Sequence, residues 1–395
     1  MATFALSTVM VQNLYASIHL SAPPFTTLKK SSTYLLILLL ALLHSCSPEE
    51  TDSQVFKVEK APLDQIALSE YFKVVSVDAI DEGNEDLITD VSKVKYQDSL
   101  VYILDRFDGK KISVYNHITG SFLHNIGHQG EGPGGYDIPY DFYVDEGSKT
   151  ISVLTAGKIL KYSSENGKYF DQTPLDLPAV RFIKLHNGHW LFILGRGTKY
   201  QVLITDDSFN VIKRHLPRLR MHNMLAWEPI ITTDGNRTLI VRNFDNHIYE
   251  VTEDNELEVF LQLDFGDNPI PEEDKNTLSK SSEINAKYPK TALLRRNFYA
   301  STAHYFFVYQ KNKRYKVVAH SLSSNDYINF DVLDVNNDLL LKKGGSFPSI
   351  IGMDDKGSLI SYVRSNIKQS NDGRIIVDGN RNQEALTLIR FKPNF

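Results

Sequence analysis

The sequence is organised as a repeat of groups of four short β-strands. Runs of four to seven residues alternate between apolar and polar side chains, as in residues 99–104, and turns containing Gly, Asn or Asp separate them. Alternation with a period of two predicts a strand with one buried face. Each group spans roughly 40 to 45 residues, which is typical of one blade of a β-propeller. The predicted strands are residues 99–104, 111–115 and 121–126; 141–144, 150–154, 159–162 and 168–171; 181–185, 189–194, 201–205 and 211–215; and 229–232, 238–242, 247–251 and 257–263.

Closure into a ring is the arrangement that this repeat favours. Several open four-stranded sheets would each expose unpaired backbone groups at their edges, whereas a ring leaves only short edges. Two β-sandwich domains are the alternative, but they would require a linker and a change of composition near the middle of the chain, and neither is present. We therefore predict an all-β chain in which residues 55–395 form a single β-propeller of about six four-stranded antiparallel blades. A seven-bladed ring is the open alternative.

The two ends of the predicted propeller both contain strand-like segments. Residues 71–77 lie near its start and residues 385–391 (ALTLIRF) lie at its carboxyl end. We expect these two segments to join the same blade or adjacent blades, because a ring closes only when its ends meet.

One segment interrupts the strand pattern. Residues 269–289 contain Pro271-Glu272-Glu273-Asp274, and a proline followed by acidic residues suits the first turn of a helix. Leu278 and Ile284 follow at partly helical spacing. We predict one short helical insertion that ends by Pro289.

An apolar run precedes the predicted propeller. Lys29 and Lys30 come before residues 34–43 (YLLILLLALL), and this run is too short to cross a hydrocarbon core of about 30 Å. The run is typical of the apolar part of a secretory signal. It is followed by Leu43-His44-Ser45-Cys46, and Cys46 is the only cysteine of the chain. The segment resembles a bacterial lipoprotein signal, in which the cysteine is diacylated and becomes the new amino terminus; a signal anchor with a chance cysteine is the alternative.

This resemblance implies a division of the amino-terminal region. Residues 1–45 would be the signal region, with the lipoprotein signal at about residues 29–45 and an upstream part explained by a start codon assigned too early. The polar residues 46–54 would be a flexible tether. With Cys46 as the lipid attachment site, no thiol is left for a disulfide, a metal cluster or catalysis. The expected location is the cell envelope, on a bacterial membrane and specifically the outer membrane.

The charge balance argues against a nucleic-acid partner. The net charge is −5, and a phosphate backbone requires a clustered basic surface. The most basic short segment, residues 213–220, surrounds Pro217 and is interpreted as a solvated loop.

Residues 100–143 resemble the first blade of the six-bladed β-propeller lipoproteins of Bacteroidetes, an NHL-like family. The matching residues are Gly120, Leu123, Gly127, Gly130, Gly132, Pro133, Gly134 and Tyr136. Gly135 stands where the family usually has Glu. The resemblance implies a cell-envelope propeller, without an established catalytic activity, that works near glycan or nutrient uptake systems.

The glycine-rich loop at residues 127–135 is interpreted as structural. It lacks the Lys-Ser/Thr pair of a phosphate-binding loop, and no helix follows it. Glycines permit positive φ where the chain crosses between blades, and Tyr136 would pack beneath them. The predicted structural loop residues are Gly127, Gly130, Gly132, Pro133 and Gly134.

No residue is predicted to be catalytic and no metal or cofactor is predicted. His186 and His189 would diverge on an extended strand and flank a turn. Residues 334–338 begin like a calcium loop, but Leu339 replaces the required Gly and Gly345 occupies the final acidic position. Gly-x-Ser-x-Gly and HExxH motifs are absent from the sequence.

The function that these features favour is a ligand- or protein-binding module of the cell envelope. Loops that join one blade to the next gather on one face of a propeller, and Trp, Tyr and Arg are common at binding hot spots. The candidate ligand-binding residues are Tyr136, Arg181, Arg220, Trp227 and Lys343. The expected partners are the membrane, through the lipid anchor, and a protein or glycan ligand. The alternative is an envelope hydrolase or lyase that uses the central face.

Overall fold

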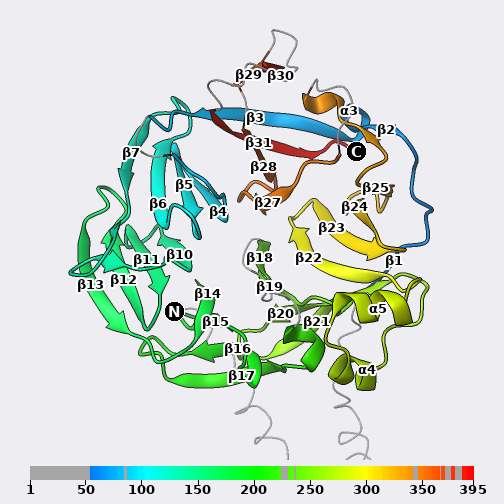
Figure 1. Cartoon of the computed structure of the whole chain (residues 1–395), viewed down its shortest axis with the longest axis horizontal. Coiled ribbons are helices and arrows are strands. Elements are labelled where there is room, and N and C mark those ends of the chain that lie inside the picture. The colour runs from blue at the N-terminus through cyan, green and yellow to red at the C-terminus, as the bar shows by residue number, and fades with distance from the viewer. Residues whose placement is uncertain are drawn as a thin grey trace, which may run out of the picture. The chain divides into compact units, whose positions relative to one another are not determined.

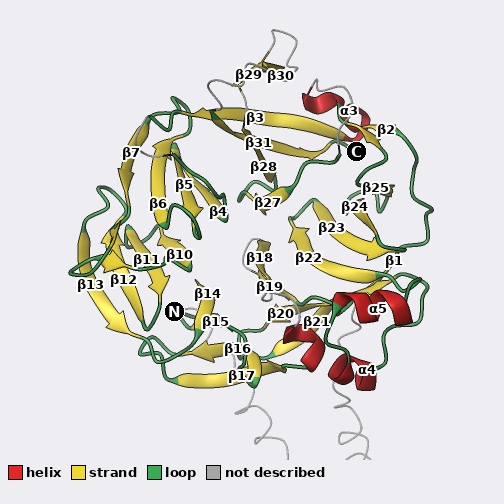
Figure 2. Cartoon of the chain, in the orientation of Figure 1, coloured by secondary structure: helices red, strands yellow, loops and turns green. Residues whose placement is uncertain are grey.

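The fold is a ring of six β-sheets. The computed structural model describes residues 54–83, 87–223, 230–234, 237–340, 346–364, 366–369, 375–378 and 385–395. All of them belong to one compact unit, Ser53–Phe395. Six four-stranded antiparallel blades surround a common axis, as Figure 1 shows, and strands dominate over helices in Figure 2. The prediction of a six-bladed propeller is confirmed, and the alternative of seven blades is wrong.

Five blades are built from consecutive strands. Blade 1 contains β4 (Lys93–Gln97), β5 (Leu100–Asp105), β6 (Lys111–Asn116) and β7 (Phe122–Asn125). Blade 2 contains β10 (Asp141–Asp145), β11 (Thr150–Thr155), β12 (Lys158–Ser163) and β13 (Tyr169–Pro174). Blade 3 contains β14 (Ala179–Lys184), β15 (Trp190–Leu194), β16 (Tyr200–Thr205) and β17 (Val211–Pro217). Blade 4 contains β18 (Ile230–Asp234), β19 (Arg237–Val241), β20 (His247–Val251) and β21 (Leu257–Asp264). Blade 5 contains β22 (Leu293–Ala300), β23 (His304–Lys311), β24 (Arg314–Ser321) and β25 (Tyr327–Asp331).

Blade 6 combines the two ends of the propeller. Its inner three strands are β27 (Ile350–Met353), β28 (Leu359–Arg364) and β31 (Leu386–Pro393), and its outer strand is β3 (Phe72–Ile80). The antiparallel register runs from Phe72 opposite Pro393 to Ile80 opposite Leu386. The expectation that the two ends share a blade is confirmed.

An amino-terminal strap follows the outer rim of blades 4 to 6. The strap (residues 54–67) starts with β1 (Gln54–Lys57), which pairs in parallel with β21. Leu63 then bridges to Phe330 of blade 5, and β2 (Ile66–Ala67) pairs with β26 (Val335–Asn336). The short helix α3 (Leu68–Tyr71) leads into β3. The strap covers outer strands that would otherwise be free to pair with other chains.

Six connectors join the outer strand of one blade to the inner strand of the next. Because the four strands of each blade alternate in direction, the connectors and the turns between second and third strands lie on one face, here called the connector face. The described parts of the connectors are residues 81–83, 87–92, 126–140, 175–178, 218–223, 265–292, 332–340 and 346–349. The connector at residues 265–292 contains α4 (Glu272–Thr277) and α5 (Ser281–Lys287), so the predicted insertion is two helices rather than one.

The remaining short elements are β8 (His128–Gln129), β9 (Gly135–Tyr136), η1 (Arg220–Asn223), η2 (Asp338–Leu340), and the hairpin of β29 (Asn366–Gln369) and β30 (Ile375–Asp378).

The core consists of apolar layers between neighbouring blades. At the closure, Phe72 of β3 is 1% exposed and its ring lies 5.8 Å from that of Phe391 and 5.5 Å from that of Phe347. Offset and edge-to-face aromatic pairs of this kind add to the free energy gained by burying the rings. The closure is therefore held by backbone pairing and by an aromatic cluster at the same place.

Replacing Phe72 by Ala is predicted to lower the free energy of unfolding by about 3 to 5 kcal/mol, because a large buried ring is removed and a cavity is left. Val75→Ala on the same strand is the control, since Val75 is 46% exposed and should change stability by less than about 0.5 kcal/mol. Urea unfolding measures both variants. Equal effects of the two substitutions would show that the ring does not depend on this cluster.

Deleting residues 385–395 is predicted to make the protein insoluble or to cause a large loss of stability. The deletion removes β31, which lies between β28 and β3, so both strands lose their partner. Thermal unfolding of the truncated chain tests this. A melting temperature within a few degrees of the full chain would refute it.

Candidate functional site

The structure describes three of the five candidate ligand-binding residues. Tyr136, Arg181 and Arg220 lie within the described residues, whereas Trp227 and Lys343 lie outside them, as does Cys46. The three described residues occupy different environments, so each is considered in turn.

Tyr136 is buried beneath the glycine-rich loop. Its side chain is 2% exposed, and its hydroxyl donates a hydrogen bond of 2.7 Å to the carbonyl oxygen of Ile126. Gly127 has φ +69°, and a Cβ there would lie 2.7 Å from Cε1 of the Tyr136 ring. Tyr136 therefore packs between blades 1 and 2 and offers no surface to a ligand. Positive φ angles also occur at Gly130, Gly132 and Gly134, which flank Pro133.

Gly135 stands at a position with no room for a side chain. A Cβ at this position would lie 2.3 Å from the carbonyl oxygen of Gly130, across the pairing of β8 with β9. The loop must open before any side chain can fit at this position. Because residue 135 is Gly, an acidic role at this position does not apply to this chain.

Arg181 lies on the innermost strand of blade 3, beside a network that ties three blades together. The Lys93 ammonium donates to Asp141 Oδ1 at 2.7 Å and to the Phe142 carbonyl oxygen at 2.7 Å. Asp141 Oδ2 accepts a hydrogen bond from the backbone N–H of Phe182 at 3.1 Å, so one buried carboxylate links β4, β10 and β14. Arg181 directly precedes Phe182 at a β-bulge and is partly exposed. Within the described part of the chain, its guanidinium makes no hydrogen bond or ion pair.

Arg220 lies in the connector between blades 3 and 4. It is exposed in η1, and the neighbouring Met221 is fully buried. The apolar cluster that receives Met221 contains Phe244, Ile270, Ile284 and Leu293, so η1 is fixed against the helical connector. Backbone hydrogen bonds from Ser279 and Lys280, and more weakly the Arg220 charge, lower the pKa of the Glu283 carboxyl. Arg220 lies in a connector, whereas Arg181 is the third residue of strand β14, and no hydrogen bond or ion pair joins the two among the described residues.

The structure adds a charged network that the sequence analysis missed. Asp245, in the turn between β19 and β20, is 4% exposed and accepts hydrogen bonds from three side chains. The donors are Arg242 Nε at 3.0 Å, His247 Nδ1 at 2.8 Å and the Tyr249 hydroxyl at 2.7 Å. Burial alone would raise the pKa of Asp245, but the His247 and Tyr249 hydrogen bonds and the Arg242 charge outweigh it and hold that pKa well below its usual range. The four residues lie within residues 242–249, but Asp245 belongs to the turn and not to β20, so strand periodicity alone does not bring them together.

The Asp245 network consists of a buried carboxylate paired with a guanidinium and an oriented imidazole. A carboxylate bound to one ring nitrogen orients an imidazole, and His247 is partly exposed. Within the described residues, no Ser, Thr or Cys side chain is hydrogen-bonded to His247, and no group of three or more His, Cys, Asp or Glu side chains could hold a metal ion.

Among the residues that the structure describes, none of the helices is both long and apolar enough to cross a membrane.

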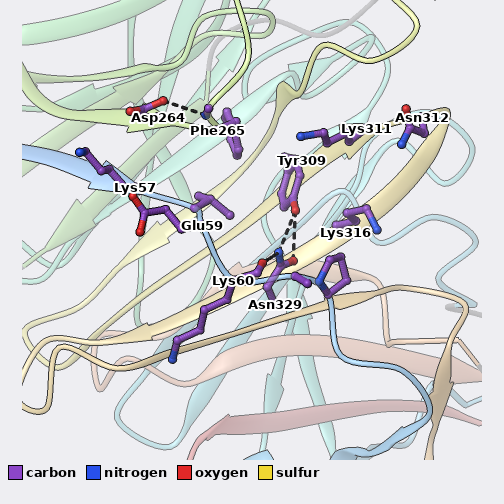
Figure 3. Close-up of a pocket in the computed structure, with 14 residues that line it drawn as sticks. Lys57, Glu59, Lys60, Asp264, Phe265, Tyr309, Lys311, Asn312, Lys316 and Asn329 are labelled. Carbon is purple, nitrogen blue, oxygen red and sulfur yellow. Dashed lines mark hydrogen bonds between the residues drawn. The ribbon is translucent and has the colours of Figure 1, made fainter.

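A cavity of about 520 Å³ lies between the strap and blade 5 (Figure 3). The strap supplies one wall, and the ends of β21 and β23 together with β24 and β25 supply the others. The residues that line it are Lys57, Val58, Glu59, Lys60, Ala61, Pro62, Asp264, Phe265, Gly266, Tyr309, Lys311, Asn312, Lys316 and Asn329. The sequence analysis did not predict this cavity, because it is formed by segments that are distant in the sequence.

Comparison with solved structures supports the fold. A Bacteroides fragilis protein whose name describes it as exported superposes with a TM-score of 0.65 at 16% identity, over 86% of this chain and 99% of that one. A member of the DUF4221 family from Bacteroides vulgatus superposes with a TM-score of 0.50 at 12% identity, over 82% of this chain and 99% of that one. These identities are low, so the two similarities concern the fold alone.

No curated protein matches the sequence. The model of a domain of unknown function, DUF4934, matches residues 53–376, which include most of the strands of all six blades. The chain therefore belongs to the DUF4934 family.

Proposed function

We propose that the protein is a lipid-anchored binding module of the cell envelope that holds a glycan or protein ligand on the connector face. The observation that carries the proposal is Arg181, a partly exposed cation on an inner strand that makes no hydrogen bond or ion pair within the described residues. Similarity in fold to a Bacteroides protein named as exported agrees with an envelope location. Association with glycan or nutrient uptake is part of the same proposal.

The position of Arg181 suits an acceptor-rich ligand. A guanidinium presents five N–H donors in a planar fork that matches carboxylates and paired hydroxyl groups. Asp141 is paired with Lys93 and also accepts the backbone N–H of Phe182, so this carboxylate holds the residue next to Arg181 and, among the described residues, makes no hydrogen bond or ion pair with the Arg181 guanidinium itself. The connectors between the blades differ in length, and loops held by a rigid scaffold are a common location for binding residues.

Arg181→Ala and Arg220→Ala are each predicted to weaken ligand binding by about 1 to 4 kcal/mol, which is the usual hot-spot range, without loss of folding. The full chain is labelled and applied to arrays of glycans and of surface peptides, and the strongest ligand is then titrated against each variant. Lys149→Ala is the control, because Lys149 lies on the opposite face, in the turn between the first and second strands of blade 2. If both Arg variants bind normally while substitutions on the opposite face abolish binding, the proposal has the wrong face.

Cys46→Ser is predicted to abolish lipid attachment and to release the protein from the membrane fraction. The cysteine follows an apolar run in a sequence that resembles a lipoprotein signal, and stable anchoring requires two or more acyl chains. Growth with a radioactive fatty acid followed by fractionation measures both effects. A serine variant that is still labelled, or that still sediments with membranes, would contradict the assignment.

A further inference from the structure

The cavity between the strap and blade 5 has firmly held walls. The backbone N–H groups of Glu59 and Lys60 both donate to the Tyr327 hydroxyl, at 2.8 and 2.6 Å. Asn329 donates from Nδ2 to the Lys60 carbonyl oxygen at 2.9 Å, and the Tyr309 hydroxyl donates to Asn329 Oδ1 at 3.2 Å. The strap is thus attached to blade 5 by fixed hydrogen bonds, and the space behind it belongs to the folded state (Figure 3).

Cationic side chains of blade 5 lie on the sheet face that lines this cavity. In the antiparallel register Tyr309 lies opposite Lys316, and Lys311 lies opposite Arg314. Residues 309 and 311 are two apart on β23, so all four side chains share one face of the sheet. Lys311 and Arg314 are like charges placed opposite each other, and each has a carboxylate partner, Asp267 for Lys311 and Asp331 for Arg314, that offsets the repulsion.

The nearby carboxylates leave Lys316 poorly satisfied. Arg314 takes Asp331 Oδ2 at 2.7 Å and also contacts Asp334 at 3.0 Å. The Lys316 ammonium lies 3.7 Å from the same Asp331 oxygen, its side chain is 14% exposed, and no hydrogen bond is made to it within the described residues. Asp331 Oδ2 lies beside this ammonium without a hydrogen bond to it, so the charge of Lys316 is only partly compensated, and an anion within hydrogen-bond distance would compensate it further.

The other lysines that line the cavity differ in whether their ammonium groups already have a partner. Lys60 points away from Lys311 in Figure 3, toward the carboxylate of Asp326 and the carbonyl oxygen of Tyr327. Lys311 pairs with Asp267 at 2.9 Å and keeps a side chain that is 30% exposed. Lys57 is exposed on the strap and makes no ion pair among the described residues. Glu59 and Asp264 are the only acidic residues in the cavity lining.

We propose that this cavity binds a small organic anion, whose acidic group is held by the ammonium groups of Lys316 and Lys311. Its volume falls within the range typical of small-molecule sites and is far larger than one inorganic anion requires. Phe265 and Pro62 contribute apolar surface for the body of the ligand, and Asn312 and Glu59 supply polar groups for its hydroxyls. The site is separate from Arg181 and Arg220.

The test uses D-glucuronate as the probe, with D-glucose as its neutral counterpart and inorganic phosphate as an anion without an organic body. Isothermal titration of the full chain at low ionic strength measures each affinity. Glucuronate should bind in the millimolar range or tighter, and glucose should not. Lys316→Met and Lys311→Met should each weaken glucuronate binding by about tenfold or more, because each removes a charged hydrogen-bond donor.

Lys161→Met is the matched control. Lys161 also lies on the third strand of a blade and pairs with a single carboxylate, Asp171, at 3.0 Å, but it is far from the cavity in blade 2. This variant should bind glucuronate like the unmodified chain, and melting temperatures should establish that all three variants fold. Absence of glucuronate binding, or binding that both cavity variants retain, would overturn the site. Lysine-dependent binding of phosphate alone would overturn its assignment to an organic anion.

Discussion

The ring exists because β3 pairs with β31. This pairing joins the beginning of the propeller to its end, and without it blade 6 would lose its outer strand and the molecule would be an open arc with exposed edges. Every interface between blades depends on it indirectly, because each blade is held by two neighbours only when the ring is closed. The buried Phe72 lies at this junction, where it contacts aromatic rings from both the connector before blade 6 and β31.

The fold could be predicted from the sequence because each blade is a local unit. Four strands joined by short turns leave an alternating pattern in residues 141–171, and the structure places β10 to β13 there. The inner strand β4 was missed, since its sequence KVKYQ carries charged residues at alternate positions and reads as a surface segment. One of these charges, Lys93, has a buried partner in the next blade, and such a contact cannot be inferred from neighbouring residues along the chain.

The candidate site could be predicted only in part. The concentration of loops on one face follows from propeller topology, and it led to the choice of Arg181 and Arg220, of which the structure places Arg220 in a connector and Arg181 in strand β14. Tyr136 was placed in the same set because aromatic residues in loops often bind ligands, yet burial by the glycine loop assigns it to packing. The Asp245 network and the strap cavity depend on turn geometry and on contacts between segments that are distant in the sequence, as in the pairing of Leu63 with Phe330. No local pattern encodes such contacts.

The order of the strands in blade 6 has a consequence for biogenesis. β3 is synthesised before the strands of blades 1 to 5, whereas its partner β31 is synthesised after all of them. Until then β3 is an unpaired strand with alternate apolar residues, which is the kind of segment that associates wrongly with other chains. Bringing β3 and β31 together also closes the long loop between them, and the conformational entropy lost in closing it slows folding. A chain of this design is therefore prone to wrong association during synthesis, and closure of its ring is governed by the arrival of β31.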